Sequence, residues 1–238
     1  MSPLPTFPAE LPEAGTAVAQ ALLTRRSVRA FLDTPVPRDT VEGILQLASR
    51  TPSGTNIQPW KVYACTGAVR DALSDELIAL HDAGGGGHKA EYAYYPTGWR
   101  EPYLSRRRKL GWDYYGIVGL TRDNKPGMHR QHGRNFAFFG APVGLFFTLD
   151  RDLERGSWLD AGMFVQSVMI AARAFGLHTC PQAAFTTYHA VVARHLSIPQ
   201  GEMVLCGMSL GHLDAQAPEN ALTTERVPVA GFASFHGW

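Results

Sequence analysis

The sequence of 238 residues carries little net charge, few cysteines and no long hydrophobic run. Its formal net charge is +1 and 45% of its residues are hydrophobic, so generic polyanion binding and intrinsic disorder are both disfavoured. The longest apolar stretches, such as residues 141–149, are too short to cross a bilayer, because a spanning helix needs about 20 apolar residues. We therefore expect neither a nucleic acid nor a membrane as a partner.

Cysteine is scarce and widely spaced. Cys65, Cys180 and Cys206 are odd in number and form no CxxC pair, which argues against a disulfide framework or a zinc knuckle. The segment 1–5 lacks the basic and apolar regions of a secretory signal. These features predict a protein of the reducing cytoplasm.

The patterns of several catalytic classes are also missing. The run Gly84–Gly87 is not GxGxxG and follows no predicted strand, so a Rossmann phosphate loop is not indicated. No Ser-His-Asp or Cys-His nucleophile pattern is visible. His129 and His132 are three residues apart but have no carboxylate at helical spacing, so we predict no metal site.

Two polar segments near the start of the chain are its most informative feature. Residues 25–29, Arg-Arg-Ser-Val-Arg, place three guanidiniums and a hydroxyl within five positions, and residues 52–60 form a turn-rich loop that closes on a tryptophan. Guanidiniums donate paired, charge-assisted hydrogen bonds to phosphate. A Gly-Thr-Asn turn offers backbone N–H groups and an amide to a flat polar ring. Together the segments predict a phosphorylated cofactor that ends in a polar heterocycle.

Hydrophobic spacing predicts helices and strands around a sizeable core. Helices are expected over 14–24, from Asp39 or Thr40 as the cap to residue 48, and over 71–81, 158–175 and 188–196. Strands are expected over 61–65, 142–149 and 203–210. This order favours an α+β fold in which helices pack around a mixed sheet.

Residues 84–127 differ from the rest of the chain, because tyrosine and tryptophan alternate there with arginine. We interpret them as an inserted, partly helical and aromatic-rich lid. The aromatic residues from Tyr92 to Tyr115 suit either stacking on an aromatic substrate or packing within the lid itself. The run Arg106–Lys109 is more typical of a solvated helix face than of a site for the 2′-phosphate of NADPH.

The segments 25–29 and 52–60, together with Gly-His-Leu-Asp at 211–214 and Arg-Val-Pro at 226–228, resemble the FMN-dependent nitroreductase superfamily. The resemblance runs from about residue 14 to 228. It implies one nitroreductase-like α+β domain over 1–238, with a mixed, mainly antiparallel sheet surrounded by helices. It also implies an extended C-terminal arm, 214–238, and a homodimer with FMN sites at the subunit interface.

The resemblance also implies roles for individual residues. Arg25, Ser27 and Arg226 would hold the FMN phosphate, and Arg29 would lie near N1 and O2 of the flavin ring. The turn at 53–56 would grip the ring from the second subunit, and a loop at 179–184 would run along the isoalloxazine. The complete set of predicted cofactor-binding residues is Arg25, Arg26, Ser27, Arg29, Pro52, Ser53, Gly54, Asn56, Pro181, Gln182, Ala183 and Arg226.

The function implied by the resemblance is an FMN-dependent NAD(P)H oxidoreductase that reduces nitroaromatic or similar electron-poor acceptors. NADPH or NADH and a small aromatic substrate would use the same flavin face in turn, which predicts ping-pong kinetics. No catalytic side chain is required, because the flavin carries the hydride chemistry. The alternatives are a flavin-dependent reductive dehalogenase of the same superfamily and a non-catalytic FMN carrier.

Overall fold

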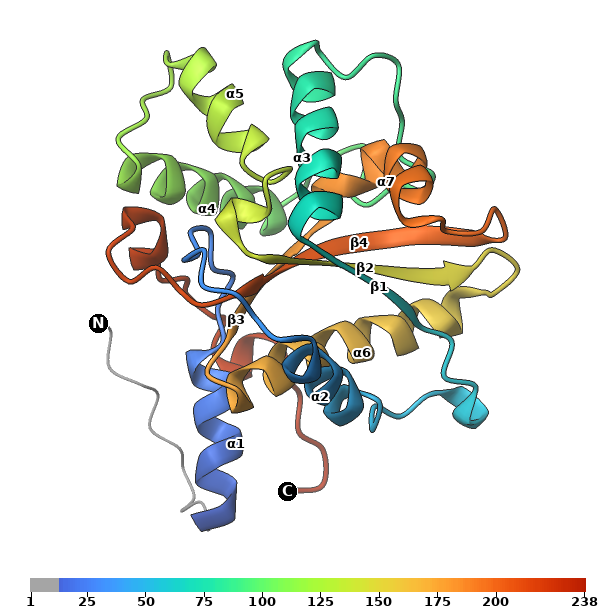
Figure 1. The fold of residues 1–238 in the computed structure, drawn as a ribbon. Helices are drawn as coiled ribbons and strands as arrows, with labels where there is room; N and C mark the ends of the chain where they lie inside the picture. The colour runs from blue at the N-terminus through green and yellow to red at the C-terminus, as the bar shows by residue number, and fades with distance from the viewer. Residues whose placement is uncertain (1–12) are drawn as a thin grey trace.

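Four strands form one antiparallel sheet in the order β1-β2-β4-β3 at the centre of the molecule (Figure 1). The strands are β1 (Lys61–Thr66), β2 (Val143–Asp150), β3 (His178–Gln182) and β4 (Glu202–Gly211). This arrangement comes from a computed structural model, which describes residues 13–238. The expectation about the segment 1–5 lies outside the described residues.

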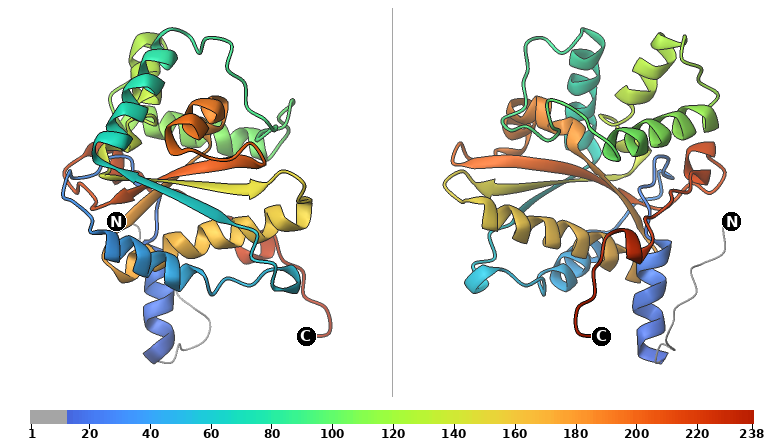
Figure 2. Two further views of the ribbon diagram at one scale, coloured as in Figure 1. Left: turned by 45° about the vertical axis from the view of Figure 1, so that its right-hand side comes forward. Right: turned by 180° about the vertical axis from the view of Figure 1, so that it is seen from behind.

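Helices cover both faces of the sheet, as Figure 2 shows. One face carries α2 (Arg38–Ala48) and α6 (Arg155–Ala174), whereas α3 (Gly67–Asp82), α4 (Tyr103–Ile117), α5 (Lys125–Gly133) and α7 (His189–Leu196) lie on the other side. The helix α1 (Glu13–Thr24) projects from the end of the sheet near β3. Within residues 13–238 no helix is both long enough and apolar enough to span a membrane.

The core has two parts because the sheet separates it. Val41 and Ile44 of α2 and Phe164 and Val168 of α6 pack on one face, with helical spacing of their apolar side chains. The core on the opposite face contains an aromatic cluster that includes Phe136, Phe138, Phe146 and Phe185. Central β2 is buried along almost its whole length, as its continuous apolar run predicted.

The structure corrects the expectation of a loop at 179–184. Residues 178–182 form the edge strand β3, in which Cys180 is paired with Ser209 and Pro181 with Met208. Proline donates no hydrogen bond to a neighbouring strand, so it is tolerated at a sheet edge. Because proline is otherwise rare in strands, Pro181 argued against a strand at these positions in the sequence. A short 3₁₀ segment, Ala183–Tyr188, follows directly.

Two helix starts also differ from expectation. The helix α2 begins at Arg38 after Pro37, and neither Asp39 nor Thr40 caps it. Asp39 instead lies in the first turn, where its charge suits the positive end of the helix dipole. The helix α3 begins at Gly67, four residues before the predicted start at residue 71, because the chain turns into the helix directly from β1.

Candidate functional site

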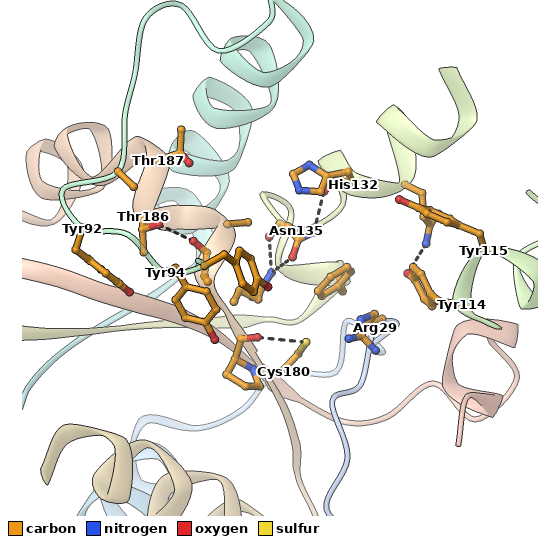
Figure 3. Close-up of a pocket in the computed structure, with 18 residues that line it drawn as sticks. Arg29, Tyr92, Tyr94, Tyr114, Tyr115, His132, Asn135, Cys180, Thr186 and Thr187 are labelled. Atoms are coloured by element: carbon orange, nitrogen blue, oxygen red, sulfur yellow. Dashed lines mark hydrogen bonds between the residues drawn. The ribbon is translucent and has the colours of Figure 1, made fainter. Parts of the chain in front are cut away.

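A cavity of about 520 Å³ opens between β3 and the segments of the lid (Figure 3). This volume lies within the range of small-molecule sites, roughly 300–1,000 Å³. Figure 3 shows Tyr92 and Tyr94 on one side of the space and Tyr114 and Tyr115 on the other. The lining residues outside the lid are Arg29, Gln131, His132, Asn135, Phe139, Cys180, Pro181, Gln182, Ala183, Ala184, Thr186 and Thr187.

Arg29 reaches the cavity because its segment is attached to β3. Ser27 forms a parallel bridge with Thr179, and the Val28 N–H donates to the Thr179 carbonyl at 3.1 Å. Buried Asn220 holds the other side, since its side-chain oxygen accepts from the Arg29 N–H at 2.9 Å. Its amide group donates to the carbonyl of Ala30 at 2.8 Å. The Arg29 backbone is therefore held by segments that are far apart in the sequence.

The side chain of Arg29 lies against the lid. Its guanidinium carbon is 5.1 Å from the ring centre of Tyr114 on α4, within cation–π range. The Tyr114 hydroxyl accepts from the Gln131 amide at 2.6 Å, which connects α4 to α5. Burial raises the pKa of Tyr114, so this hydroxyl stays protonated at neutral pH.

A chain of hydrogen bonds fixes the wall behind β3. Ser209 donates to the Gln182 side-chain oxygen at 2.6 Å, and the Gln182 amide donates to the Asn135 carbonyl at 2.7 Å. Gln182 and Ser209 are both buried. Because the side-chain polar atoms of Gln182 and Ser209 are paired in this series of hydrogen bonds, the wall presents a defined surface to a ligand.

Arg25 lies within range of the charge of Arg226, although 201 positions separate them in the sequence, and its own charge acts on Cys180, which lines the cavity. Burial, and then the charge of Arg226, lower the pKa of Arg25. Among the described residues neither guanidinium has a carboxylate within salt-bridge distance. Two adjacent cations without an anion are the donor set that a phosphate group requires.

Arg26 has a different partner from this pair. Its guanidinium donates to the Asn220 carbonyl at 2.8 Å, and its charge acts on Arg173 and His178. Of the four predicted residues at 25–29, Arg26 is thus the one whose side chain serves the connection between the N-terminal segment and Asn220. Its placement favours a structural role over direct phosphate binding.

The predicted loop residues Pro52, Ser53, Gly54 and Asn56 lie against α6, apart from the cavity of their own chain. The Gly54 N–H donates to the Asp160 carboxylate at 3.3 Å, and the Trp60 ring stacks on Phe164 at 4.6 Å. Thr55, Asn56 and Gln58 have positive φ values of 48°, 61° and 48°. Such backbone strain in non-glycine residues concentrates at functional sites, so the loop is a candidate ligand clamp.

These donors fit FMN. The Arg25–Arg226 pair suits its phosphate, Arg29 suits the electron-rich edge of its ring, and the fixed surface of Pro181, Gln182 and Ala183 suits its flat face. The fit rests on the two cations without a carboxylate partner and on a cavity whose described lining residues include no carboxylate. Of the predicted residues, Arg29, Pro181, Gln182 and Ala183 line the cavity, whereas Arg25, Arg26, Ser27 and Arg226 do not.

Asn220, Tyr114 and Cys180 were not in the predicted set of cofactor-binding residues. Asn220 and Tyr114 act through contacts with Arg29 that the sequence does not reveal. Cys180 lines the cavity, and burial raises the pKa of its thiol to about 11, so it is protonated at neutral pH. Among the lid aromatics, Tyr92, Tyr94, Tyr95, Tyr114 and Tyr115 line the cavity. Ring contacts within the lid confirm that these residues pack against one another, and stacking on a substrate stays a prediction.

A histidine cluster lies between α3 and α5. The rings of His81 and His129 stack at 3.9 Å, and His129 Nε2 lies 3.1 Å from the Asp82 carboxylate. His81 Nε2 lies 3.1 Å from the His129 carbonyl oxygen. One ring nitrogen of each histidine is thus engaged within the cluster, and we assign these contacts to packing between the two helices.

We expect His178, next to Arg26, to make stability depend on pH. Burial, then the charges of Arg173, Arg26 and His212, lower the pKa of His178 to about 4. The folded protein keeps the ring neutral, whereas the unfolded chain binds a proton below its ordinary pKa of about 6.5. This contribution is complete above pH 6.5 and is lost as the pH falls from 6.5 to 4, by about 1–2 kcal/mol after allowing for solvent screening.

The measurement is urea unfolding at pH 7, 5.5 and 4.5, compared between the original protein and His178→Gln. The difference between the two proteins should shrink as the pH falls, because glutamine does not titrate. Parallel losses of stability in both would show that His178 is not the titrating group.

Comparison with known proteins agrees with this geometry. Residues 22–212 match the model of the Nitroreductase family. A protein named 4-nitrobenzoate reductase from Nocardioides sp. (strain LMS-CY) is 41% identical over 213 residues, covering 89% of this chain and 86% of that protein. Another of the same name, from Pseudomonas putida, is 39% identical over 90% of this chain and 93% of its own length.

The fold is also that of solved nitroreductases. The structure is similar to NfnB from Sphigopyxis sp. strain HMH, described as FMN and NADPH-dependent, with a TM-score of 0.89 and 37% identity over 93% of this chain and 99% of that one. FMN-dependent NfnB from Mycobacterium smegmatis, solved in complex with NADPH, gives a TM-score of 0.89 at 28% identity, covering 94% and 100% of the two chains. These findings confirm the predicted superfamily and fold: the chain belongs to the nitroreductase family.

Proposed function

We propose that this protein is an FMN-dependent oxidoreductase that uses NADPH or NADH to reduce nitroaromatic compounds. The observation that carries the proposal is the cavity itself, in which Arg29 and the β3 surface face a group of tyrosines without a carboxylate among the described lining residues. Relatives named 4-nitrobenzoate reductase, chloronitrobenzene nitroreductase and nitrobenzene nitroreductase support the choice of acceptor.

Each part of the site has a task in this reaction. FMN, when bound, supplies two-electron hydride chemistry. Arg29 stabilises negative charge at the pyrimidine edge of the ring, and the Arg25–Arg226 pair holds the phosphate. The tyrosines offer ring faces that can orient flat reactants. Because one open face serves reductant and acceptor in turn, the kinetics should be ping-pong.

The test is an anaerobic titration of the purified protein with NADPH and then NADH, recorded as visible spectra. Bleaching of the flavin, followed by recovery on addition of a nitroaromatic compound, is the expected result. A flavin that stays oxidised with both nucleotides would instead support the dehalogenase or carrier alternatives. Protein that takes up no added FMN would contradict the cofactor assignment.

We also propose a homodimer in which the loop at 52–60 completes the partner's cavity. The helix α6 presents an apolar groove lined by Trp158, Leu159, Gly162, Met163 and Gln166, and the Leu159 side chain is 68% exposed. The loop packs on this same helix, through the contact between Gly54 and Asp160. A second copy on α6 would cover the apolar groove, which is unusual as free surface.

The C-terminal arm supports the same dimer, because Phe232, Phe235 and Trp238 are exposed along it. Leu159→Glu should produce monomers in analytical ultracentrifugation, and an unchanged mass would exclude α6 from the interface.

We further infer that residues 1–238 form one domain, with 84–127 as its lid and 214–238 as its arm. Three free cysteines support a cytoplasmic location.

Replacing Arg29 with Ala should slow flavin reduction more than it weakens FMN binding. Loss of a cation at the charge that develops on the ring should cost roughly 10- to 100-fold in the reduction rate. The phosphate stays bound by other residues, so the Kd of FMN should change much less. Stopped-flow reduction and FMN titration measure the two effects, with Arg29→Lys as the control that keeps the charge. A larger effect on Kd than on rate would contradict this role.

A further inference from the structure

Positive charge is concentrated in one part of the lid. Residues 100–109 contain five cations and one carboxylate, although the net charge of the whole chain is +1. Lys109 is neutralised by Asp113 at 2.6 Å and by Glu225 at 3.7 Å. Within the described part of the chain, Arg100, Arg106, Arg107 and Arg108 have no carboxylate within 4 Å.

Three of these arginines lie on aromatic rings. The Arg107 guanidinium is 5.1 Å from the ring centre of Trp99, and those of Arg100 and Arg106 are 5.0 and 5.9 Å from that of Tyr103. Stacking occupies the face of a guanidinium and restricts its motion, whereas its N–H edges stay free to donate. These exposed arginines are thus oriented for an anion that the described residues do not supply.

The stacked rings continue to the cavity. Tyr94 and Tyr95 line the cavity and contact each other edge to face at 4.7 Å, and Tyr95 lies 5.4 Å from Trp99. Trp99 in turn lies under Arg107. A row of aromatic rings therefore leads from the cavity to the arginines without a carboxylate partner.

One face of the helix α4 also connects the cavity with Arg107. Arg107 and Tyr114 are seven residues apart, which places them on one helix face about 10 Å from each other along the axis. Gly111 lies between them, and a Cβ atom there would meet no atom within 4 Å. At Gly111, the surface between the cavity and Arg107 therefore carries no side chain and is not covered by other atoms.

We propose that Trp99 and the arginines 100, 106 and 107 bind the adenosine 2′-phosphate end of NADPH while its nicotinamide enters the cavity. The idea rests on the proposed function and names NADPH as the preferred reductant. Guanidinium forks match a phosphate, and Trp99 offers a ring to stack on adenine. This departs from the solvated-face interpretation of Arg106–Lys109, because only Lys109 is paired with carboxylates and the arginines are held on aromatic rings.

The test measures binding of two adenine nucleotides to the FMN-loaded protein by calorimetry. Adenosine 2′,5′-bisphosphate carries the distinguishing phosphate of NADPH, and AMP lacks it. The bisphosphate should bind more tightly than AMP, and Arg107→Ala should raise its Kd about tenfold, with a smaller effect on AMP. Trp99→Ala should weaken both nucleotides. Arg38→Ala is the matched control, since that exposed arginine is paired with Glu42 on α2.

Equal Kd values for the two nucleotides, or an Arg107→Ala variant that loses affinity for both equally or for neither, would overturn the proposal. The same preparations separate this outcome from failure of the proposed function. Bleaching by NADH and recovery with a nitroaromatic compound test the oxidoreductase activity without the 2′-phosphate. If the Arg107→Ala protein remained an active oxidoreductase and kept the same ratio of Kd values for the bisphosphate and AMP as the original protein, only the proposed arginine site would be contradicted.

Discussion

Replacing Arg226 with Ala is expected to raise the Kd of FMN roughly 10- to 100-fold, the loss of one or two charge-assisted hydrogen bonds. Burial, and then the positive charge of Arg226, lower the pKa of Arg25, so the two guanidiniums lie close enough for Arg226 to repel Arg25. A phosphate between them would remove this repulsion and engage both guanidiniums. The effect should diminish at high salt, because Arg226 is exposed.

The measurement is titration of apoprotein into FMN, followed by quenching of flavin fluorescence. Arg26→Ala is the informative comparison, because Arg26 belongs to the same sequence motif but donates to the Asn220 carbonyl. We expect a smaller change in Kd for Arg26→Ala than for Arg25→Ala or Arg226→Ala. Equal losses in all three variants would indicate a general effect of positive charge and contradict the two-arginine clamp.

Replacing Gly207 with Ala is expected to destabilise the fold by about 1–3 kcal/mol, the usual cost of overpacking a core. Gly207 lies on β4 opposite Phe146, at the aromatic cluster. A Cβ atom there would lie 2.5 Å from Cδ2 of Phe185 and 3.2 Å from Cε1 of Phe146. Both phenylalanines are fully buried, so neither ring can move aside without displacing its neighbours.

Urea unfolding at one protein concentration and saturating FMN gives the free energy of unfolding for this comparison. Gly156→Ala is the control, since a Cβ atom at that position in α6 meets nothing within 4 Å. Adding Phe185→Leu to Gly207→Ala should recover part of the loss by making room. A Gly207→Ala protein as stable as the Gly156→Ala control would show that the aromatic cluster is not rigid.

Elements with regular hydrophobic spacing were predictable from sequence, and those whose partners lie far away were not. The helix α6 and the strand β2 occur within a few residues of their predicted bounds, because one or both faces of each are buried and their apolar residues recur accordingly. The strand β3 was missed because it is short, contains Pro181 and exists through its pairing with β4. Its hydrogen bonds are made to residues about thirty positions away, which no local pattern reveals.

The residues of the site were likewise predictable where local side-chain chemistry marks them and not where they act through distant partners. The motif at 25–29 identified a phosphate-binding segment from the chemistry of its side chains, but it did not distinguish Arg25 from Arg26. That distinction depends on the hydrogen bond of Arg26 to the Asn220 carbonyl, a contact between residues 194 positions apart. Asn220 and Tyr114 were not predicted as site residues, because each acts only through its contact with Arg29.

By itself, the sequence determined the family, the cofactor class and most of the helices and strands, because these follow from side-chain chemistry and periodicity along the chain. The tertiary structure alone decided which tyrosines line the cavity and that Asn220 contacts both Arg26 and Arg29. The contacts of Asn220 join residues more than 190 positions apart. Such contacts are made by packing on the sheet, and packing leaves no periodic signal in a single sequence.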